Sequence, residues 1–338
     1  MTTASTIPYQ LRPHKAIERN LFVSILKKLD RYSKINIHDY RYVGFGAPFL
    51  EDFKSLHVEF GIENMDCIEY DKLAYSRQVF NNPYHFVKLH NDSSTNYING
   101  ATLKQDRNQI IWLDFASPKE FRQQLKDAEL ISEKLSSLDI LKFTFNSHIA
   151  AFISSHYLRC KPYEFNVVLK LLKNDPTYQR YLPDSITSKN LADNFPAVLR
   201  AMGMRAIKRG LAKAGNNFVF NHIAAFNYAD GQQMTTMTGI LSSEQDFKDI
   251  LIQSNFKNWE FYESEPKTEL IPGNEISVPA MTISERIEID KLIPAKSIAS
   301  IASALKFSFG NTNEDHLKLL QGYCRYYKYL PYYSKVTY

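Results

Sequence analysis

The sequence predicts an α/β fold organised around one open, mostly parallel β-sheet. Three features of the chain indicate this. Short apolar runs alternate with helical patterns from residue 39 to residue 145, and polar residues stand where several of those runs end. Two β-rich runs joined by Asp230-Gly231 follow later in the chain. Alternation of this kind is typical of a parallel sheet covered by helices, and Asp-Gly between β-rich runs is a strong hairpin signal.

A glycine turn separates the first strand from the first helix of this pattern. The turn reads Tyr42-Val43-Gly44-Phe45-Gly46-Ala47-Pro48. Apolar residues at helical spacing follow it, and Gly61 is placed to end that helix, because glycine readily adopts the left-handed conformation of a C-terminal cap. The second strand covers residues 65–69 and ends in Glu69.

The next three strands also lead into polar residues. The third, residues 86–89, precedes Asn91-Asp92, and the fourth, residues 110–114, ends in Asp114. The fifth, residues 140–145, leads into a polar segment that includes His148. Because the carboxyl ends of parallel strands meet at one edge of the sheet, these residues predict a nucleoside site there.

Each of these residues also has a structural interpretation. Glu69 and Asp114 stand where acids often cap the helix that follows. Asp92 lies in an Asn-Asp-Ser-Ser string that is typical of a turn and helix cap. A single Gly-x-Gly is weak evidence for a ligand, because turns of many kinds use glycine. For proton transfer, His148 is better placed than His222, which lies inside an apolar strand typical of a core.

Helical patterns dominate the remainder of the chain. A helix is expected from about residue 119 to 135, and prolines divide residues 149–214 into short helical pieces that we interpret as an insertion. Residues 218–226 and 234–241 are expected to form an antiparallel pair at the edge of the sheet. Beyond them, Thr282 and Glu285 form a plausible capping box. The predicted organisation is an N-terminal helical segment (1–38), an α/β domain (39–245, with the insertion at about 149–214) and a mainly helical extension (246–338).

Composition limits the classes of protein to consider. The 338-residue chain is 44% hydrophobic, and its net charge of +5 permits a polyanionic partner without requiring one. No secretory signal is visible, and no apolar run approaches the roughly 18 residues needed to span a bilayer. Three distant cysteines argue against a disulfide framework. We therefore expect a cytoplasmic protein without a membrane partner. The sequence has no CxxC or Cys/His spacing typical of a metal site, so no metal is expected, and the oligomeric state stays unknown.

Five alternating strands followed by a terminal hairpin resemble the class I S-adenosylmethionine-dependent methyltransferase fold. The resemblance covers about residues 39–241. It implies a Rossmann-like class I methyltransferase sheet with a terminal antiparallel hairpin, here with a helical insertion and a C-terminal helical extension. The Arg12-Pro13-His14-Lys15 string, the Gly44-Phe45-Gly46 turn and residues 323–333 are also similar to a bacterial group of O-methyltransferase-like proteins.

The resemblance implies a role for several residues. Gly44 and Gly46 would let the backbone approach the methionine part of S-adenosylmethionine, Glu69 would accept its ribose hydroxyls, and Asp92 would accept from its adenine amino group. For a hydroxyl acceptor, Asp114 or His148 would be the base. The looser resemblance places Arg12, His14 and Lys15 on the substrate side, as part of a lid over the cofactor.

Departures from the family pattern leave a second interpretation open. The turn lacks the usual opening acid, and Ala47-Pro48 follows its second glycine. The chain would then be a catalytically degenerate methyltransferase-fold protein that binds nucleic acid or joins a complex. The basic residues between Arg200 and Lys213 and the tyrosines of residues 323–333 would supply its surface. The alternatives are a solvated helix face and a tail packed on the core.

Overall fold

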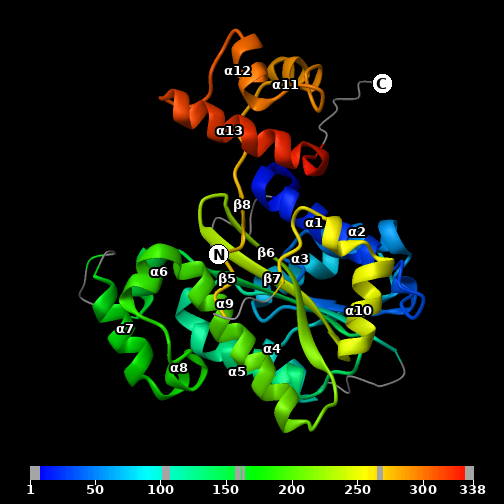
Figure 1. The fold of residues 1–338 in the computed structure, drawn as a ribbon. Helices are drawn as coiled ribbons and strands as arrows, with labels where there is room; N and C mark the ends of the chain where they lie inside the picture. The colour runs from blue at the N-terminus through cyan, green and yellow to red at the C-terminus, as the bar shows by residue number, and fades with distance from the viewer. Residues whose placement is uncertain (1–7, 101–106, 157–160, 162–163, 265–268, 332–338) are drawn as a thin grey trace.

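A mixed β-sheet with the strand order β3-β2-β1-β4-β5-β7-β6-β8 organises the structure (Figure 1). The computed structural model describes residues 8–100, 107–156, 161, 164–264 and 269–331. The first five strands are parallel and have the bounds Arg41–Gly44 (β1), Asn64–Ile68 (β2), Val87–His90 (β3), Gln109–Asp114 (β4) and Ile140–Asn146 (β5). The predicted Rossmann-like α/β sheet is confirmed.

The predicted hairpin is also confirmed, but its position at the sheet edge is wrong. Strands β6 (Val219–Ala229) and β7 (Gln233–Ser242) pair antiparallel around the Asp-Gly turn, and β7 pairs antiparallel with β5. A short strand β8 (Asn274–Ile276) then pairs parallel with the end of β6. Three residues are too few to show a period of two, so the sequence pattern did not reveal β8.

Helices cover both faces of the sheet. On one face lie α1 (Pro13–Leu29), α2 (Glu51–Phe60) and α10 (Glu244–Gln253); on the other lie α4 (Ser94–Gly100), α5 (Phe121–Ser132) and α9 (Ser188–Lys213). Helix α3 (Lys72–Asn81) precedes β3. The side chains divide accordingly into two buried clusters, one on each face.

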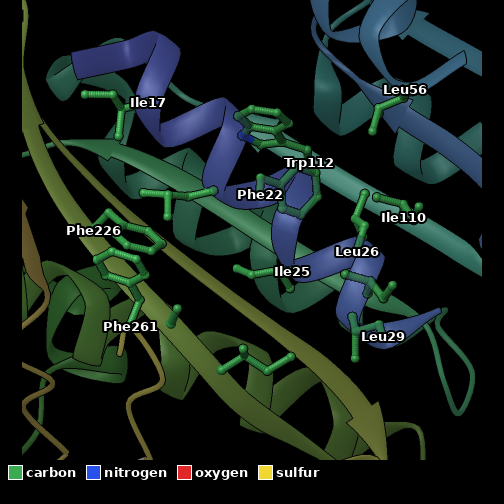
Figure 2. Close-up of a cluster of buried hydrophobic side chains, with 14 of the residues drawn as sticks. Ile17, Phe22, Ile25, Leu26, Leu29, Leu56, Ile110, Trp112, Phe226 and Phe261 are labelled. Carbon is green, nitrogen blue, oxygen red and sulfur yellow. The ribbon is translucent and has the colours of Figure 1, made fainter. Parts of the chain in front are cut away.

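Helix α1 packs its apolar face across the centre of the sheet. Pro13 begins the helix, where its missing N–H costs no hydrogen bond. Figure 2 shows Ile17, Phe22 and Ile25 of this helix beside Trp112 of β4 and Phe226 of β6. The rings of Phe22 and Trp112 meet edge to face with centroids 5.0 Å apart. The apolar contact fixes α1 against the strands that lead to the predicted site.

The insertion and the extension are both mainly helical. The insertion contains α6 (Ile149–Ser155), α7 (Phe165–Asn174), α8 (Pro176–Tyr181) and the long helix α9, which is kinked at Asn194 ahead of Pro196. The extension contributes α11 (Ile283–Asp290), α12 (Ile298–Ala304) and α13 (Asn313–Tyr326), which lie together at the top of Figure 1. The predicted capping box of Thr282 and Glu285 is present at α11. Among the described helices, none is long and apolar enough to cross a bilayer.

Helix α13 approaches the backbone near β8 very closely. A Cβ at Gly322 would lie 1.9 Å from the carbonyl oxygen of Ser277, well inside van der Waals contact. Tyr326 of the same helix donates its hydroxyl hydrogen to the carbonyl oxygen of Glu275 at 2.9 Å. Gly322 therefore lets the extension dock on the last strand of the sheet.

Gly322→Ala is expected to destabilise the protein by about 1–3 kcal/mol, because the added methyl group meets backbone that cannot move away. Gly100→Ala is the matched control, since nothing lies within 4 Å of a Cβ at that helical glycine. Urea unfolding of the two variants measures the difference. A Gly322→Ala protein as stable as the control would contradict the close packing.

Candidate active site

A cavity of about 660 Å³ opens at the carboxyl ends of β1, β2, β3 and β4. Residues from the strand ends, from α2 and from the N-terminal part of α1 line it. Six of the sequence-predicted site residues are brought together in its wall: Arg12, Lys15, Gly46, Glu69, Asp92 and Asp114. The sheet order places Asp92, Glu69, Gly46 and Asp114 in that sequence across the edge, so the cavity is elongated along it.

The glycine turn is shaped by packing inside the protein. A Cβ at Gly46 would lie 2.4 Å from the Leu50 side chain and 2.7 Å from the Cys67 sulfur. A Cβ at Gly44 would lie 2.6 Å from the Tyr42 hydroxyl, and Gly44 does not line the cavity. Packing against protein neighbours therefore already accounts for glycine at both positions. The expected close approach of a ligand to Gly46, which lines the cavity, stays a prediction.

At one end of the cavity, Glu69 and Asp92 follow adjacent strands. Glu69 accepts the backbone N–H of Asp71 at 2.9 Å, and Asp92 accepts that of Ser93 at 2.8 Å. Burial raises the pKa of Glu69 above its ordinary value. Neither acid caps the helix that follows it. The N-cap of α3 is Asp71, whose side chain accepts the N–H of Ala74, and Ser93 Oγ accepts the N–H of Asn96 in α4. Both Glu69 and Asp92 line the cavity, and their contacts with a ligand stay a prediction.

At the other end, α1 carries cations onto Asp114. Arg19 places Nη2 2.7 Å from Asp114 Oδ2 and Nε 3.4 Å from Asp52 Oδ1. Lys15 Nζ lies 3.3 Å from the same oxygen of Asp114. The Arg19 guanidinium also lies over the Trp112 ring, 4.6 Å from its centroid. Sequence reasoning missed Arg19 and Asp52 as site residues, although Lys15 and Arg19 stand four residues apart, on one face of α1.

These contacts set the basicity of the groups in the cavity. Burial acts to raise the pKa of Asp114, but Lys15 and Arg19 outweigh it and hold that pKa well below its usual range. Burial, helped by the charge of Arg19, lowers the pKa of Lys15. Asp114 is therefore a carboxylate with little tendency to take a proton, whereas Lys15 releases its proton more easily than an exposed lysine does.

A second ion pair lies deeper, beneath α1. Glu18 and Lys142 of β5 are both fully buried and in direct contact. Lys142 Nζ also lies 4.0 Å from the centroid of the Trp112 ring. Adjacent residues 18 and 19 thus place a buried anion and a buried cation against the sheet. Sequence reasoning missed this pair as well, because the contact joins residues 124 positions apart.

Besides Gly44, two predicted site residues, His14 and His148, do not line the cavity. His14 contacts the carbonyl oxygen of Ala229 at 2.7 Å and Asp230 Oδ1 at 3.1 Å, and its other ring nitrogen accepts the N–H of Val278 at 3.1 Å. Burial opposes protonation of His14, but the bond to Asp230 raises its pKa overall. His148 caps α6 and does not line the cavity. Asn146 stands at the carboxyl end of β5, the strand that pairs with β4. Its side-chain amide donates to the carbonyl oxygen of Ala116 and contacts the side chain of Gln232.

His222 is buried and lies outside this cavity. It is 2% exposed in β6, and neither ring nitrogen has a hydrogen-bond partner among the described residues. Burial lowers its pKa to about 3. The expected core location of this histidine is thus confirmed.

The basic residues of α9 do not form a uniform cationic surface. Arg200 is buried and donates to Asn227 Oδ1 at 2.6 Å. Arg205 pairs with Glu269 at 3.1 Å, and Lys213 pairs with Glu133 at 2.6 Å. Tyr323 and Tyr326 are buried against the core, which agrees with the packed-tail alternative. Residues 332–338, which include Tyr332 and Tyr333, lie outside the described residues.

Comparison with protein families identifies the chain. Residues 7–338 match the model of the family described as "Putative O-methyltransferase". The chain belongs to this family. Since the match extends beyond both ends of the sheet, α1 and the extension are parts of the family's common sequence. Among curated proteins, none matches the sequence.

Solved structures with a similar fold include several methyltransferases of low identity. The N-methyltransferase NodS from Bradyrhizobium japonicum WM9 aligns with a TM-score of 0.37 and 8% identity over 67% of this chain and 97% of its own. The plantazolicin methyltransferase BamL, in complex with a triazolic desmethylPZN analog and S-adenosylhomocysteine, aligns with a TM-score of 0.36 and 11% identity over 70% of this chain and 90% of its own. Cofactor-bound Rv0187 from MTB aligns with a TM-score of 0.34 and 8% identity over 68% of this chain and 80% of its own. Scores this low carry no argument about the substrate of this chain.

In the described part of the chain, no group of three or more histidine, cysteine, aspartate or glutamate side chains is arranged to hold a metal ion. The cavity wall instead combines carboxylates from the strand ends with cations from α1.

Glu18→Ala is expected to destabilise the protein by about 3–5 kcal/mol, because Lys142 would remain buried without its partner. The double variant Glu18→Leu/Lys142→Met should recover much of that loss, since it removes both charges. Lys27→Ala, which breaks an exposed pair with Glu59, is the control and should cost less than about 1 kcal/mol. Chemical unfolding measures all three. Equal losses for Glu18→Ala and Lys27→Ala would contradict the burial of the pair.

His222 should make the protein sensitive to acid. Since its pKa falls from 6.5 to about 3 on folding, the folded state binds fewer protons than the unfolded state between these values. Its contribution is complete above pH 6.5 and decreases as the pH falls toward 3. The loss of unfolding free energy between pH 7 and pH 4.5 should be about 2–3 kcal/mol smaller in His222→Gln than in the wild type. Identical pH dependence of the two proteins in urea unfolding would contradict the assignment.

Proposed function

We propose that this protein transfers a methyl group from S-adenosylmethionine to an oxygen atom of an acceptor. Three observations support the proposal. The cavity lies at the carboxyl ends of a Rossmann-like sheet, where such folds bind nucleosides. Glu69 and Asp92 follow β2 and β3 and line this cavity, and the resemblance implies contacts of these acids with a ribose and an adenine. The family description names oxygen as the kind of atom that accepts the methyl group.

The charge of the cavity is the observation that carries the proposal. Eight acidic residues but only three basic ones line it, and two of the basic ones are engaged by Asp114 and Asp52. The remaining negative charge favours a cationic ligand, because attraction between opposite charges is strong where water is partly excluded. The sulfonium of S-adenosylmethionine is such a cation. The lining acids are Glu51, Asp52, Glu69, Asp71, Asp92, Asp114, Glu120 and Asp127.

The residues of the chain would mainly bind the cofactor, orient the acceptor and remove a proton from the acceptor. The bound cofactor would supply an electrophilic methyl group on its sulfonium. Glu69 would accept the ribose hydroxyl hydrogens, and Asp92 would accept from the adenine amino group. Asp114 is a weak base, so we assign it to holding Lys15 and Arg19 in place. For an acceptor hydroxyl, Nζ of a deprotonated Lys15 is the better-placed base, because it lines the cavity and its pKa is lowered.

No observation favours the nucleic-acid-binding alternative over methyl transfer. The cavity is acidic, and a polyanion would be repelled from it. The basic residues of α9 that we named are buried or paired with acids. We therefore favour a small acceptor. We also expect the reaction to take place in the cytoplasm of a bacterium, where a reducing environment suits the free Cys67 and Cys324.

Wild-type protein should bind S-adenosylhomocysteine in a calorimetric titration, and Glu69→Ala should bind it roughly ten- to a hundred-fold more weakly. The variant removes a charge-assisted pair of hydrogen bonds to the ribose, of order 1.5–3 kcal/mol. Glu63→Ala is the control, because Glu63 is exposed at the opposite end of β2.

Two results would contradict the proposal at different levels. If the wild type does not bind S-adenosylhomocysteine, the cofactor is wrong. If Glu69→Ala binds it as tightly as Glu63→Ala does, the ribose site is elsewhere.

A further inference from the structure

Arg12 lines the cavity, and within the part of the chain that the structure describes no acidic side chain forms an ion pair with it. Its Nε is buried and has no hydrogen-bond partner among the described residues. A buried donor of a charged group is costly when it is unsatisfied, so Arg12 is suited to an anionic group supplied from outside the chain.

The neighbours of Arg12 make this arrangement more costly. Arg12 is the N-cap residue of α1 and has an extended backbone, and Lys15 and Arg19 follow it within the helix. The charge of Arg12 further lowers the pKa of Lys15, because like charges that lie close together repel each other. Asp114 compensates Lys15 and Arg19, and Asp52 also compensates Arg19. None of the described ion pairs compensates Arg12 in the same way, so an anion bound beside Arg12 would offset the cost of this arrangement.

The order of the residues along the cavity indicates which anionic group would reach Arg12. Asp92 and Glu69 lie at one end, and Asp114 with the residues of α1 lies at the other. A nucleoside with its adenine at Asp92 and its ribose at Glu69 therefore extends its remaining atoms toward α1. In S-adenosylmethionine those atoms are the amino acid portion, which ends in a carboxylate.

We propose that Arg12 binds the carboxylate of the amino acid portion of S-adenosylmethionine and so makes the site select for the intact cofactor. This inference rests on the proposed function. A bidentate guanidinium–carboxylate contact is both strong and geometrically specific. A carboxylate on the methyl acceptor has the same chemistry, and the experiment separates the two sources.

The test compares S-adenosylmethionine with its decarboxylated form, which keeps the adenosine, the sulfonium and the terminal amine. Calorimetry gives the affinity of each ligand for the wild type, Arg12→Met, Arg12→Lys and Arg31→Met. The last is the matched control, because Arg31 is an exposed arginine just beyond the end of α1. Thermal unfolding of the ligand-free variants serves to test whether each variant is folded.

The wild type and Arg31→Met should prefer S-adenosylmethionine by roughly ten- to a hundred-fold. Arg12→Met should lose that preference by binding S-adenosylmethionine more weakly, with its affinity for the decarboxylated ligand unchanged. Arg12→Lys should fall between the two, because it keeps the charge without the planar fork.

The inference is overturned if the wild type binds both ligands equally, or if Arg12→Met keeps the preference or weakens both ligands alike. Equal binding by the wild type would assign Arg12 to an anionic group of the acceptor instead. A wild type that binds neither ligand nor S-adenosylhomocysteine would overturn the proposed function itself, which is a different result.

Discussion

The attachment of α1 to the sheet through buried charges is the constraint on which the site depends. Arg19 joins the helix to Asp114 of β4 and Asp52 of α2, and Glu18 joins it to Lys142 of β5. Charges removed from water are costly unless they are paired with good geometry. A helix shifted by one residue would leave several of them unpaired, so the pairs fix the register of α1 over the strands. That register decides which residues of α1 reach the cavity.

The same helix is held at its N-terminal end by contacts with distant parts of the chain. The backbone N–H of Lys15 donates to Asp230 in the hairpin turn at 2.7 Å. His14 connects that turn to Val278, which follows β8 in the extension. The hairpin and the extension thereby position the cavity wall without lining it. This explains how residues far from the strand ends contribute to the site geometry.

The altered glycine turn is consistent with a working site. Proline and alanine after the second glycine looked like a departure that could abolish ligand binding. In the structure, Ala47 and Leu50 have positive φ angles of 44° and 52°, and the glycines make room for Leu50, Cys67 and Tyr42. Positive φ in residues with side chains persists only where surrounding packing enforces it. The turn is thus a tightly packed unit that presents Phe45, Gly46 and Pro48 to the cavity.

The sequence by itself determined the features that depend on neighbouring residues. The order of strands and helices, the hairpin at Asp230-Gly231 and the capping box at Thr282 follow from local periodicity and turn chemistry, and all are present. The location of Glu69, Asp92 and Asp114 at one edge of the sheet also followed from the sequence, because parallel strands place their carboxyl ends together.

Only the tertiary structure decided which distant residues contact one another. Glu18 and Arg19 look like solvated helix charges until the helix is placed on β4 and β5. Strand β8 is too short to show a pattern. Contacts with Ala229 and Val278 hold His14 away from the cavity wall. Burial and ion pairing depend on residues distant in the chain, so local pattern does not specify them.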